Sequence, residues 1–334
     1  MAHRTSSLKA FISWHNPRWR GWVYQAALVA GLVALAVYLV TNAFDNLAAR
    51  NVATGFGFLG NEAGFAISES MLAYSPADTY ARAISVGLLN TLKVALVGCV
   101  LATLLGAFVG LARVSSNGLV AALARIYVEV MRNIPLLLQL LFWYALVTEA
   151  LPGPRQAVEV LPDVFLSNRG LVLPGFDWQS MAWSVPVLRG FNFSGGMAVS
   201  PEFLALLLGL VLYTTAFVAE IVRAGIQAVR PGQWLAGSAL GLSRTQVLRW
   251  VVVPQALRVM VPPMTSQYLN LTKNSSLAVA IGYPDIVSIV NTAINQTGQA
   301  IEGVLIIMAA YLTVSLTIAV VMNGYNRRMA RVDR

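Results

Sequence analysis

The stretch "TKNSS", Thr272–Ser276, places chemically active groups inside a long apolar run. It holds a lysine, an asparagine and three hydroxyls, and Pro262-Pro263 interrupts the same run a little earlier. Polar groups at membrane depth are tolerated where they line a cavity or are buried in protein. We therefore predict that Lys273, Asn274 and Ser275 line a solute path. The open alternative is a polar cluster that packs helices together.

Charged side chains inside apolar runs form a second group of candidates, because ionisable groups in a bilayer usually face a cavity or a partner. Arg125, Glu129 and Arg132 stand at i, i+4 and i+7, so they share one helix face and can pair along it. Glu220 and Arg223 are three residues apart in a later run. Either Glu129 and Glu220 form a gate or a contact with a neighbouring subunit, or these charges pair within the chain and reach the interface.

Other polar residues of these runs extend the candidate path. We place Arg132, Gln139 and Tyr144 along it as lining residues. Lys93 lies inside another apolar run, where a pairing or snorkelling role is the more frequent one.

Residue types that most catalytic and metal sites require are scarce. The chain has one cysteine, Cys99, and two histidines, His3 and His15, both near the N-terminus. Zinc sites and Ser-His-Asp machinery are therefore disfavoured. None of the three lysines follows a glycine, so the phosphate loop G-x-x-x-x-G-K-[ST] is absent. We expect no catalysis by this chain, no metal and no cofactor.

The composition indicates that lipid surrounds much of the chain. Of 334 residues, 57% are hydrophobic and 11% are charged, whereas soluble domains are about 25% charged. A membrane helix needs about 20 mainly apolar residues, and six candidate spans occur, so we predict an all-α polytopic membrane protein. The spans are Trp22–Val40, Ile84–Ala112, Leu119–Val147 with a bend at Pro135, Pro201–Val229, Val251–Ile281 with a break at Pro262-Pro263, and Val304–Tyr325.

The basic residues predict the orientation. The net charge is +9, which the positive-inside rule explains better than nucleic-acid binding does. Both tails and the segment between the fourth and fifth spans are rich in arginine, whereas the loops 41–82 and 148–200 carry most of the acids. We therefore expect both termini in the cytoplasm and these two loops outside. Loop 148–200 is long enough that we expect it to be ordered or functional; an outer cap without a ligand role stays open.

The segment Val229–Pro254, "VRPGQWLAGSALGLSRTQVLRWVVVP", is polar and contains several turn-forming residues. Pro231 suits the first position of a helix, and Gly241 suits a left-handed helix end. Ser243 and Gln246 match a capping box for a second helix. We predict a short helix over 233–240, held by stiff turns and able to dock into a groove on another protein.

This segment resembles the cytoplasmic signature of binding-protein-dependent ABC transport permeases: E-A-A, three residues, G, nine residues, then I-x-L-P. Ala236, Gly241 and Pro254 match in register, while Leu235 and Gly237 stand where the signature has Glu and the second Ala. Four further blocks resemble polar amino-acid permeases, in particular the general L-amino-acid branch. They are residues 87–116, 129–144, 219–234 and 271–287.

The resemblance implies the permease fold of a type I ABC importer and half of a translocation pathway for L-amino acids in a bacterial inner membrane. It implies two ATP-binding subunits that hydrolyse the ATP, a second permease subunit (we expect a paralogue) and a periplasmic amino-acid-binding protein. The ATPases would contact the chain through a coupling surface, for which we name Gln233, Leu235, Ala236, Gly237, Ala239, Gly241 and Arg244.

The TKNSS cluster fits such a substrate. A zwitterionic amino acid needs a cation or N–H donors for its carboxylate, which Lys273, Asn274 and Ser275 supply. It also needs an acceptor for its ammonium group, for which Glu302 or Asp285 is available.

The expected organisation has three parts. They are residues 1–83 (cytoplasmic tail, first span and periplasmic loop), 84–326 (a core of five helices with the periplasmic loop 148–200 and the coupling segment 230–250) and 327–334 (a basic tail). The alternative function is a self-sufficient secondary transporter or channel, which predicts internal repeats and acids at mid-membrane.

Overall fold

The computed structural model describes residues 17–49, 54–177 and 181–331. The tails 1–16 and 332–334, which hold part of the predicted basic clusters, lie outside the described residues, as does Arg50. The chain divides into two units. One contains α2 (Pro17–Ala49), whose residues Trp19–Asn42 are long and apolar enough to cross a membrane. The other contains residues 57–296 and 300–334.

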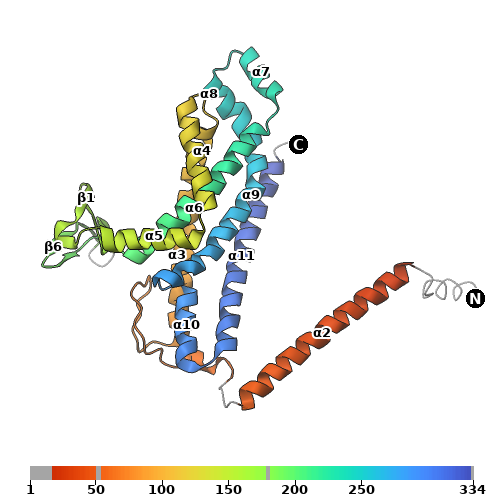
Figure 1. The fold of residues 1–334 in the computed structure, drawn as a ribbon, viewed down its shortest axis with the longest axis vertical. Helices are drawn as coiled ribbons and strands as arrows, with labels where there is room; N and C mark the ends of the chain where they lie inside the picture. Colours follow the sequence, from red (N-terminus) through yellow and green to blue (C-terminus); the bar gives the residue numbers. More distant parts are fainter. Residues whose placement is uncertain (1–16, 50–53, 178–180, 332–334) are drawn as a thin grey trace, which may run out of the picture. The chain divides into compact units, whose positions relative to one another are not determined.

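The second unit is a bundle of membrane-length and shorter helices (Figure 1). Its helices are α3 (Tyr80–Arg113), α4 (Gly118–Asn133), α5 (Leu136–Ala145), α6 (Pro201–Gln227), α7 (Pro231–Ala239), α8 (Arg244–Val247), α9 (Val253–Asn274), α10 (Ile286–Thr297) and α11 (Ala300–Arg331). In the described part of the chain, four helices are long and apolar enough to span a membrane, or up to six if each of two bent pairs counts as one span. The prediction of a mainly helical membrane protein is therefore confirmed.

Close packing of α3 against α6 depends on glycines. A Cβ atom added at Gly106 would lie 2.5 Å from the Cβ of Val218, and one at Gly110 would lie 2.6 Å from the Cβ of Val222. In membranes, where lipid is as apolar as leucine, helices associate through such small residues because the backbones can approach each other. α6 is thereby the central helix of the unit, with most of its apolar length buried.

The bend predicted at Pro135 in the third expected span is confirmed, and it is sharp. The axes of α4 and of the helical segment Leu136–Ala150, which includes α5 and a π-helical turn, differ by 102°. The bend follows Pro135, which has no N–H group to continue the ladder. The Nε2 atom of buried Gln139 donates to the carbonyl oxygens of Met131 (2.9 Å) and Ile134 (3.0 Å), so carbonyls freed by the bend have a partner.

The predicted break of the fifth span at Pro262-Pro263 is wrong. α9 continues through both prolines to Asn274. Membrane helices tolerate proline where neighbouring groups satisfy the freed carbonyls. The direction changes later, where a 3-10 helix, Ser275–Ile281, ends at Gly282 with φ +77° and α10 continues at an angle of 51°.

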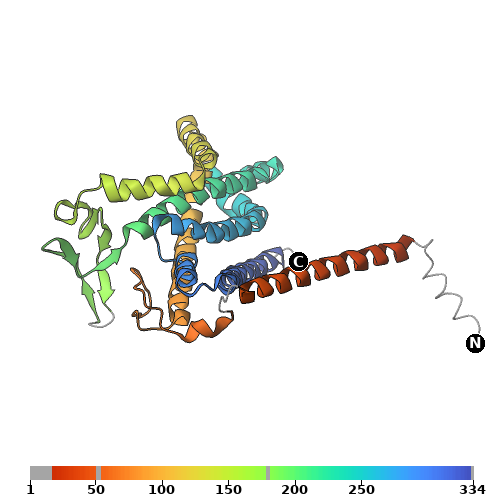
Figure 2. The ribbon, with the colours of Figure 1, turned by 60° about the horizontal axis from the view of Figure 1, so that its bottom comes forward.

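The described part of the loop between α5 and α6 is ordered, as expected, and it forms β strands, which were not predicted from the sequence. It lies at the ends of α5 and α6 in both views (Figures 1 and 2). A four-stranded antiparallel sheet has the order β1-β2-β3-β8, and two ribbons pair β4 with β5 and β6 with β7. The strands are β1 (Val158–Leu161), β2 (Val164–Ser167), β3 (Gly170–Leu173), β4 (Gly175–Asp177), β5 (Ala182–Ser184), β6 (Val187–Arg189), β7 (Asn192–Ser194) and β8 (Met197–Val199).

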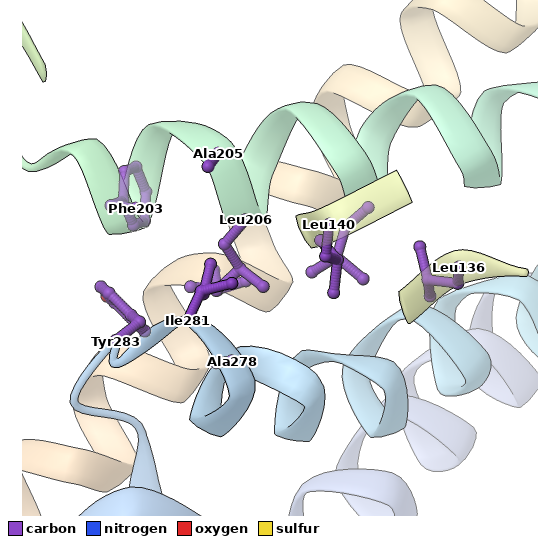
Figure 3. Close-up of a cluster of buried hydrophobic side chains, with 10 residues drawn as sticks. Leu136, Leu140, Phe203, Ala205, Leu206, Ala278, Ile281 and Tyr283 are labelled. Carbon is purple, nitrogen blue, oxygen red and sulfur yellow. The ribbon is translucent and has the colours of Figure 1, made fainter. Parts of the chain in front are cut away.

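One hydrophobic cluster joins the elements near this β region. Figure 3 shows Leu140 of α5 beside Leu206 of α6, with Leu136 further along α5 and with Ile281 and Tyr283 on the other side of Leu206. All five side chains are buried. The cluster fixes the bent α5 against α6 and against the turn that follows α9.

Candidate functional site

The segment between α6 and α9 is a helix–stop–helix unit, as predicted. Pro231 occupies the first turn of α7. Gly241 follows the helix with φ +78°. The N–H of Gly241 donates to the Ser238 oxygen (3.0 Å) and the N–H of Leu242 donates to the Gly237 oxygen (3.2 Å). These two bonds are the Schellman motif that ends helices at a left-handed residue.

The capping box of the next helix is also confirmed. The N–H of Ser243 donates to Oε1 of Gln246 (2.8 Å), and the N–H of Gln246 donates to Oγ of Ser243 (3.4 Å). Each side chain thus satisfies one free N–H group at the start of α8. The chain then continues through a π-helical turn, Leu248–Val252, into α9.

Packing ties α7 to the bundle. Gly237 is buried, and a Cβ atom at this position would lie 2.9 Å from Cγ2 of Val247. Trp234 packs against a buried cluster that includes Val247 and Ile226. The Nε2 atom of Gln255 in α9 donates to Oε1 of Gln233 at 3.3 Å. α7 is therefore in direct contact with α6, α8 and α9.

Most of the predicted coupling residues face outward. Leu235 is 72% exposed and Leu240, which the prediction did not include, is 81% exposed. These two apolar side chains are therefore available for contact with another protein. The exposed predicted residues are Gln233, Leu235, Ala236, Ala239, Gly241 and Arg244, whereas Gly237 packs inside the unit.

Beside α7 lies a groove with a volume of about 790 Å³. The turn between α3 and α4 lines one side, the end of α6 a second side, and α7 and α8 the rest. Its lining includes Trp234, Leu235 and Arg244 from the predicted coupling segment.

Glu220 joins two helices at this end of the bundle. Its carboxylate forms ion pairs with Arg223 in α6 and with Arg113 at the end of α3. The predicted pair of Glu220 and Arg223 is therefore present. Arg113 is an addition that the sequence could not identify, because the contact depends on how α3 and α6 are aligned.

We expect Glu220→Gln to lower the free energy of unfolding by about 1–2 kcal/mol, because Arg113 and Arg223 lose a charged acceptor. The value is moderate because the Glu220 side chain is 30% exposed and solvent screens the pair. Thermal unfolding in detergent measures the change. Glu129→Gln is the control, since Glu129 is exposed. An equal shift in both variants would contradict a specific role for the Glu220 pairs.

The charges on α4 do not pair along the helix, although their spacing allows it. Among the ion pairs of the described residues, none involves Arg125, Glu129 or Arg132. All three residues are exposed, and the Arg132 guanidinium instead lies over the ring of Phe217 in α6, 5.0 Å from its centroid. An ion pair across one helix turn contributes only about 0.2–0.5 kcal/mol, so the spacing alone does not enforce pairing.

Lys93 pairs outside the predicted path, in agreement with the expectation for it. Its Nζ lies 2.5 Å from Oε1 of Glu69 and 4.3 Å from the centroid of the Phe203 ring. Oγ of Ser200, which caps α6, donates to Oε2 of Glu69 at 2.6 Å. The contact ties the segment before α3 to α3 and to the start of α6.

The TKNSS residues separate at the end of α9. Lys273 is exposed and lines a pocket of about 380 Å³ with Ser276 and Tyr311, whereas Ser275 is buried and donates to the Thr272 oxygen at 2.7 Å. Asn274, the last residue of α9, is half-buried. Tyr311 of α11 lines the same pocket and was not predicted from the sequence.

Other residues proposed for the path do not line this pocket. Gln139 supports the bend at Pro135, and Tyr144 packs against the buried cluster of Figure 3. Asp285 is buried and accepts the N–H of Ser288 (2.8 Å), so it caps α10. Glu302 is also buried. No group of three His, Cys, Asp or Glu side chains within the described ranges could hold a metal ion.

Comparisons with known proteins agree with this architecture. Residues 102–331 match the family model described as "Binding-protein-dependent transport system inner membrane component". The chain is 46% identical to YhdX of Escherichia coli (strain K12), with 100% of each sequence covered. It is 42% identical to the general L-amino acid transport system permease protein AapQ of Rhizobium johnstonii, over 96% of this chain and 94% of AapQ.

A solved structure, the crystal structure of an amino acid ABC transporter with histidines, contains a chain of similar fold. It is 27% identical, with a TM-score of 0.55, and the match covers 75% of this chain and 95% of that chain. The family model covers more than half of the sequence, and the relatives cover nearly all of it. The chain therefore belongs to the family of inner-membrane components of binding-protein-dependent transport systems.

Proposed function

We propose that this chain is a permease subunit of an ATP-driven importer of L-amino acids and that residues 233–249 couple it to ATP-binding subunits. The observation that carries the proposal is the unit of α7 and α8. Leu235 and Leu240 of this unit are exposed, whereas Trp234 and Val247 pack into the bundle. The similarity to AapQ, a general L-amino acid permease protein, and to a chain of an amino acid ABC transporter supports amino acids as the substrate class.

The α7 end of the bundle would face the cytoplasm. Arg230, Arg244 and Arg249 lie around α7, and Arg327 and Arg328 lie near the C-terminal end of α11. Figure 1 shows that end of α11 on the same side of the bundle as α7. Positive residues concentrate on the cytoplasmic side of bacterial membranes, which favours this orientation and places the β region outside.

The transport cycle would then require three kinds of partner besides this chain. Two ATP-binding subunits dock at the cytoplasmic face, a second permease subunit (a paralogue) completes the pathway, and a periplasmic protein delivers the amino acid. When the ATP-binding subunits close, they displace α7 and turn the pathway from inward- to outward-facing. ATP hydrolysis takes place on the partners, and this chain supplies no catalytic group.

The docking proposal is tested by co-purification with the ATP-binding subunit and by its binding affinity for the assembled membrane part. Deletion of residues 233–242 is expected to abolish the association, because it removes α7 and its left-handed end. Exchange of exposed residues in the β region is the control and should leave the association intact. Undiminished association after the deletion would overturn the proposal, and uptake without any ATP-binding subunit would favour a self-sufficient transporter.

We propose in addition that Lys273 binds the substrate carboxylate, since its ammonium group borders a pocket large enough for a small solute. Lys273→Ala is expected to raise the apparent Kd about tenfold or more, as a charge-assisted hydrogen bond contributes about 1.5–3 kcal/mol. Amino-acid uptake or substrate-stimulated ATPase activity of the assembled complex measures this. Lys273→Arg keeps the charge and should retain most of the affinity. Unchanged rate and affinity for all amino acids would remove Lys273 from the site.

A further inference from the structure

The groove beside α7 has apolar walls and lies open at the end of the bundle. Val114 and Leu111 come from the end of α3 and the turn after it, and Ile226 and Val229 come from the end of α6. Trp234 closes the side formed by α7. The volume of about 790 Å³ is enough for several side chains of another protein. Elements distant in the sequence thus form one concave apolar surface.

The charged side chain that lines this groove is basic. Arg244 is the charged residue that lines it, and residues 226–250 contain three arginines and no Asp or Glu. The other polar lining groups are hydroxyls and an amide, from Ser115, Ser116, Thr245 and Gln227. An occupant with apolar side chains and a neighbouring carboxylate therefore complements both the apolar walls and Arg244, which we call the rim charge.

The groove is continuous with the outward face of α7. Leu235 both lines the groove and is 72% exposed, so one side chain belongs to the two surfaces. A protein that covers Leu235 also covers the mouth of the groove. Because apolar surface is stabilising only when water is excluded from it, a partner that left the groove empty would lose part of the contact.

We propose that the groove between the α3–α4 turn and α7 receives an apolar segment with an adjacent acidic residue from the ATP-binding subunit. The interface is then reciprocal: α7 inserts into the ATP-binding subunit, and that subunit inserts a segment into this chain. The inference rests on the proposed docking of the ATP-binding subunit at residues 233–249 and adds a second recognition element to it.

The test fills the groove without altering α7. Ser116 is an exposed lining residue in the turn before α4, so Ser116→Trp places a large side chain in the groove, whereas Ser116→Ala removes only the hydroxyl. The Kd of the purified ATP-binding subunit for the permease complex in nanodiscs is measured for both variants. We expect Ser116→Trp to raise the Kd at least about tenfold, because residues at the buried centre of an interface carry most of the binding energy. Ser116→Ala is expected to change the Kd less than about twofold.

A charge variant tests the rim independently. Arg244→Glu is expected to weaken binding, and the wild-type Kd is expected to rise with ionic strength more steeply than that of Arg244→Glu. Thermal unfolding of each variant shows whether the permease itself is intact. Ser115→Trp decides if Ser116→Trp does not fold, because Ser115 is an exposed lining residue of the same turn and lies outside residues 233–249.

The outcomes separate this inference from the proposed function. Normal binding by folded Ser116→Trp and Arg244→Glu, together with loss of binding on deletion of 233–242, would overturn the groove proposal and leave the docking at α7 standing. Normal binding by the deletion as well would overturn both. Loss of bound phospholipid in Ser116→Trp without any change in Kd would identify a lipid as the occupant and overturn the proposal.

Discussion

Replacement of Gly241 with valine is expected to abolish coupling between the ATP-binding subunits and transport. Gly241 has φ +78°, a conformation that costs a β-branched residue about 1–3 kcal/mol. No other atom lies within 4 Å of a Cβ atom built there, so the backbone conformation alone is responsible. With valine the Schellman bonds break, α7 ends elsewhere, and Leu235 and Leu240 no longer face the partner together.

The measurement is substrate-stimulated ATPase activity of the reconstituted complex, with hydrogen exchange over residues 231–247 as a structural readout. Gly241→Asn is the matched control, because asparagine adopts the left-handed conformation more readily than other non-glycine residues. We expect Asn to retain most of the activity and Val to lose nearly all of it. Equal activity of the two variants would show that the left-handed end of α7 is not required for coupling.

Substitution of Gly110 by leucine is expected to prevent stable assembly of the bundle. A Cβ atom at this position would lie 2.6 Å from the Cβ of Val222 and 2.8 Å from the carbonyl oxygen of Ala219. The second contact is with backbone, so no side-chain rotation relieves it and α3 must move away from α6. Overpacking of this kind costs about 1–3 kcal/mol or more, and separation of the helices also weakens the contact of Arg113 with Glu220.

Expression level and thermal unfolding of the purified chain measure this effect. Gly118→Leu is the control, since no atom lies within 4 Å of a Cβ atom at the first residue of α4. We expect a large loss for Gly110→Leu and a small change for Gly118→Leu. If Gly110→Leu unfolds at the wild-type temperature, the close approach of α3 and α6 does not determine the stability of the bundle.

Local signals in the sequence were enough to predict the unit of α7 and α8. Pro231, Gly241, Ser243 and Gln246 each act on a neighbour within a few residues, so their roles follow from residue type and spacing. The apolar runs likewise located the long helices, because the length of a membrane helix is set by the bilayer.

Roles that depend on distant partners could not be predicted in the same way. Gln139 is a polar residue in an apolar run, as a residue that lines a path would be. Its actual partners are carbonyl oxygens at the bend, and the angle of that bend depends on how α5 packs. Pro262-Pro263 suggested a break because proline removes an N–H group, but the surrounding helix continues. The strands of the loop between α5 and α6 are three or four residues long, too short to show a clear alternation.

The unbroken course of α6 has a mechanical consequence. It begins two residues after β8 ends, and its last residue is four positions before α7 begins. At 1.5 Å per residue its 27 residues extend about 40 Å. If α6 behaves as a stiff lever that pivots near one end, a tilt of about 5° displaces its other end by about 3–4 Å over that length. A small rotation at the pivoting end of α6 is therefore converted into a movement of this size at its other end, without any flexible joint between them.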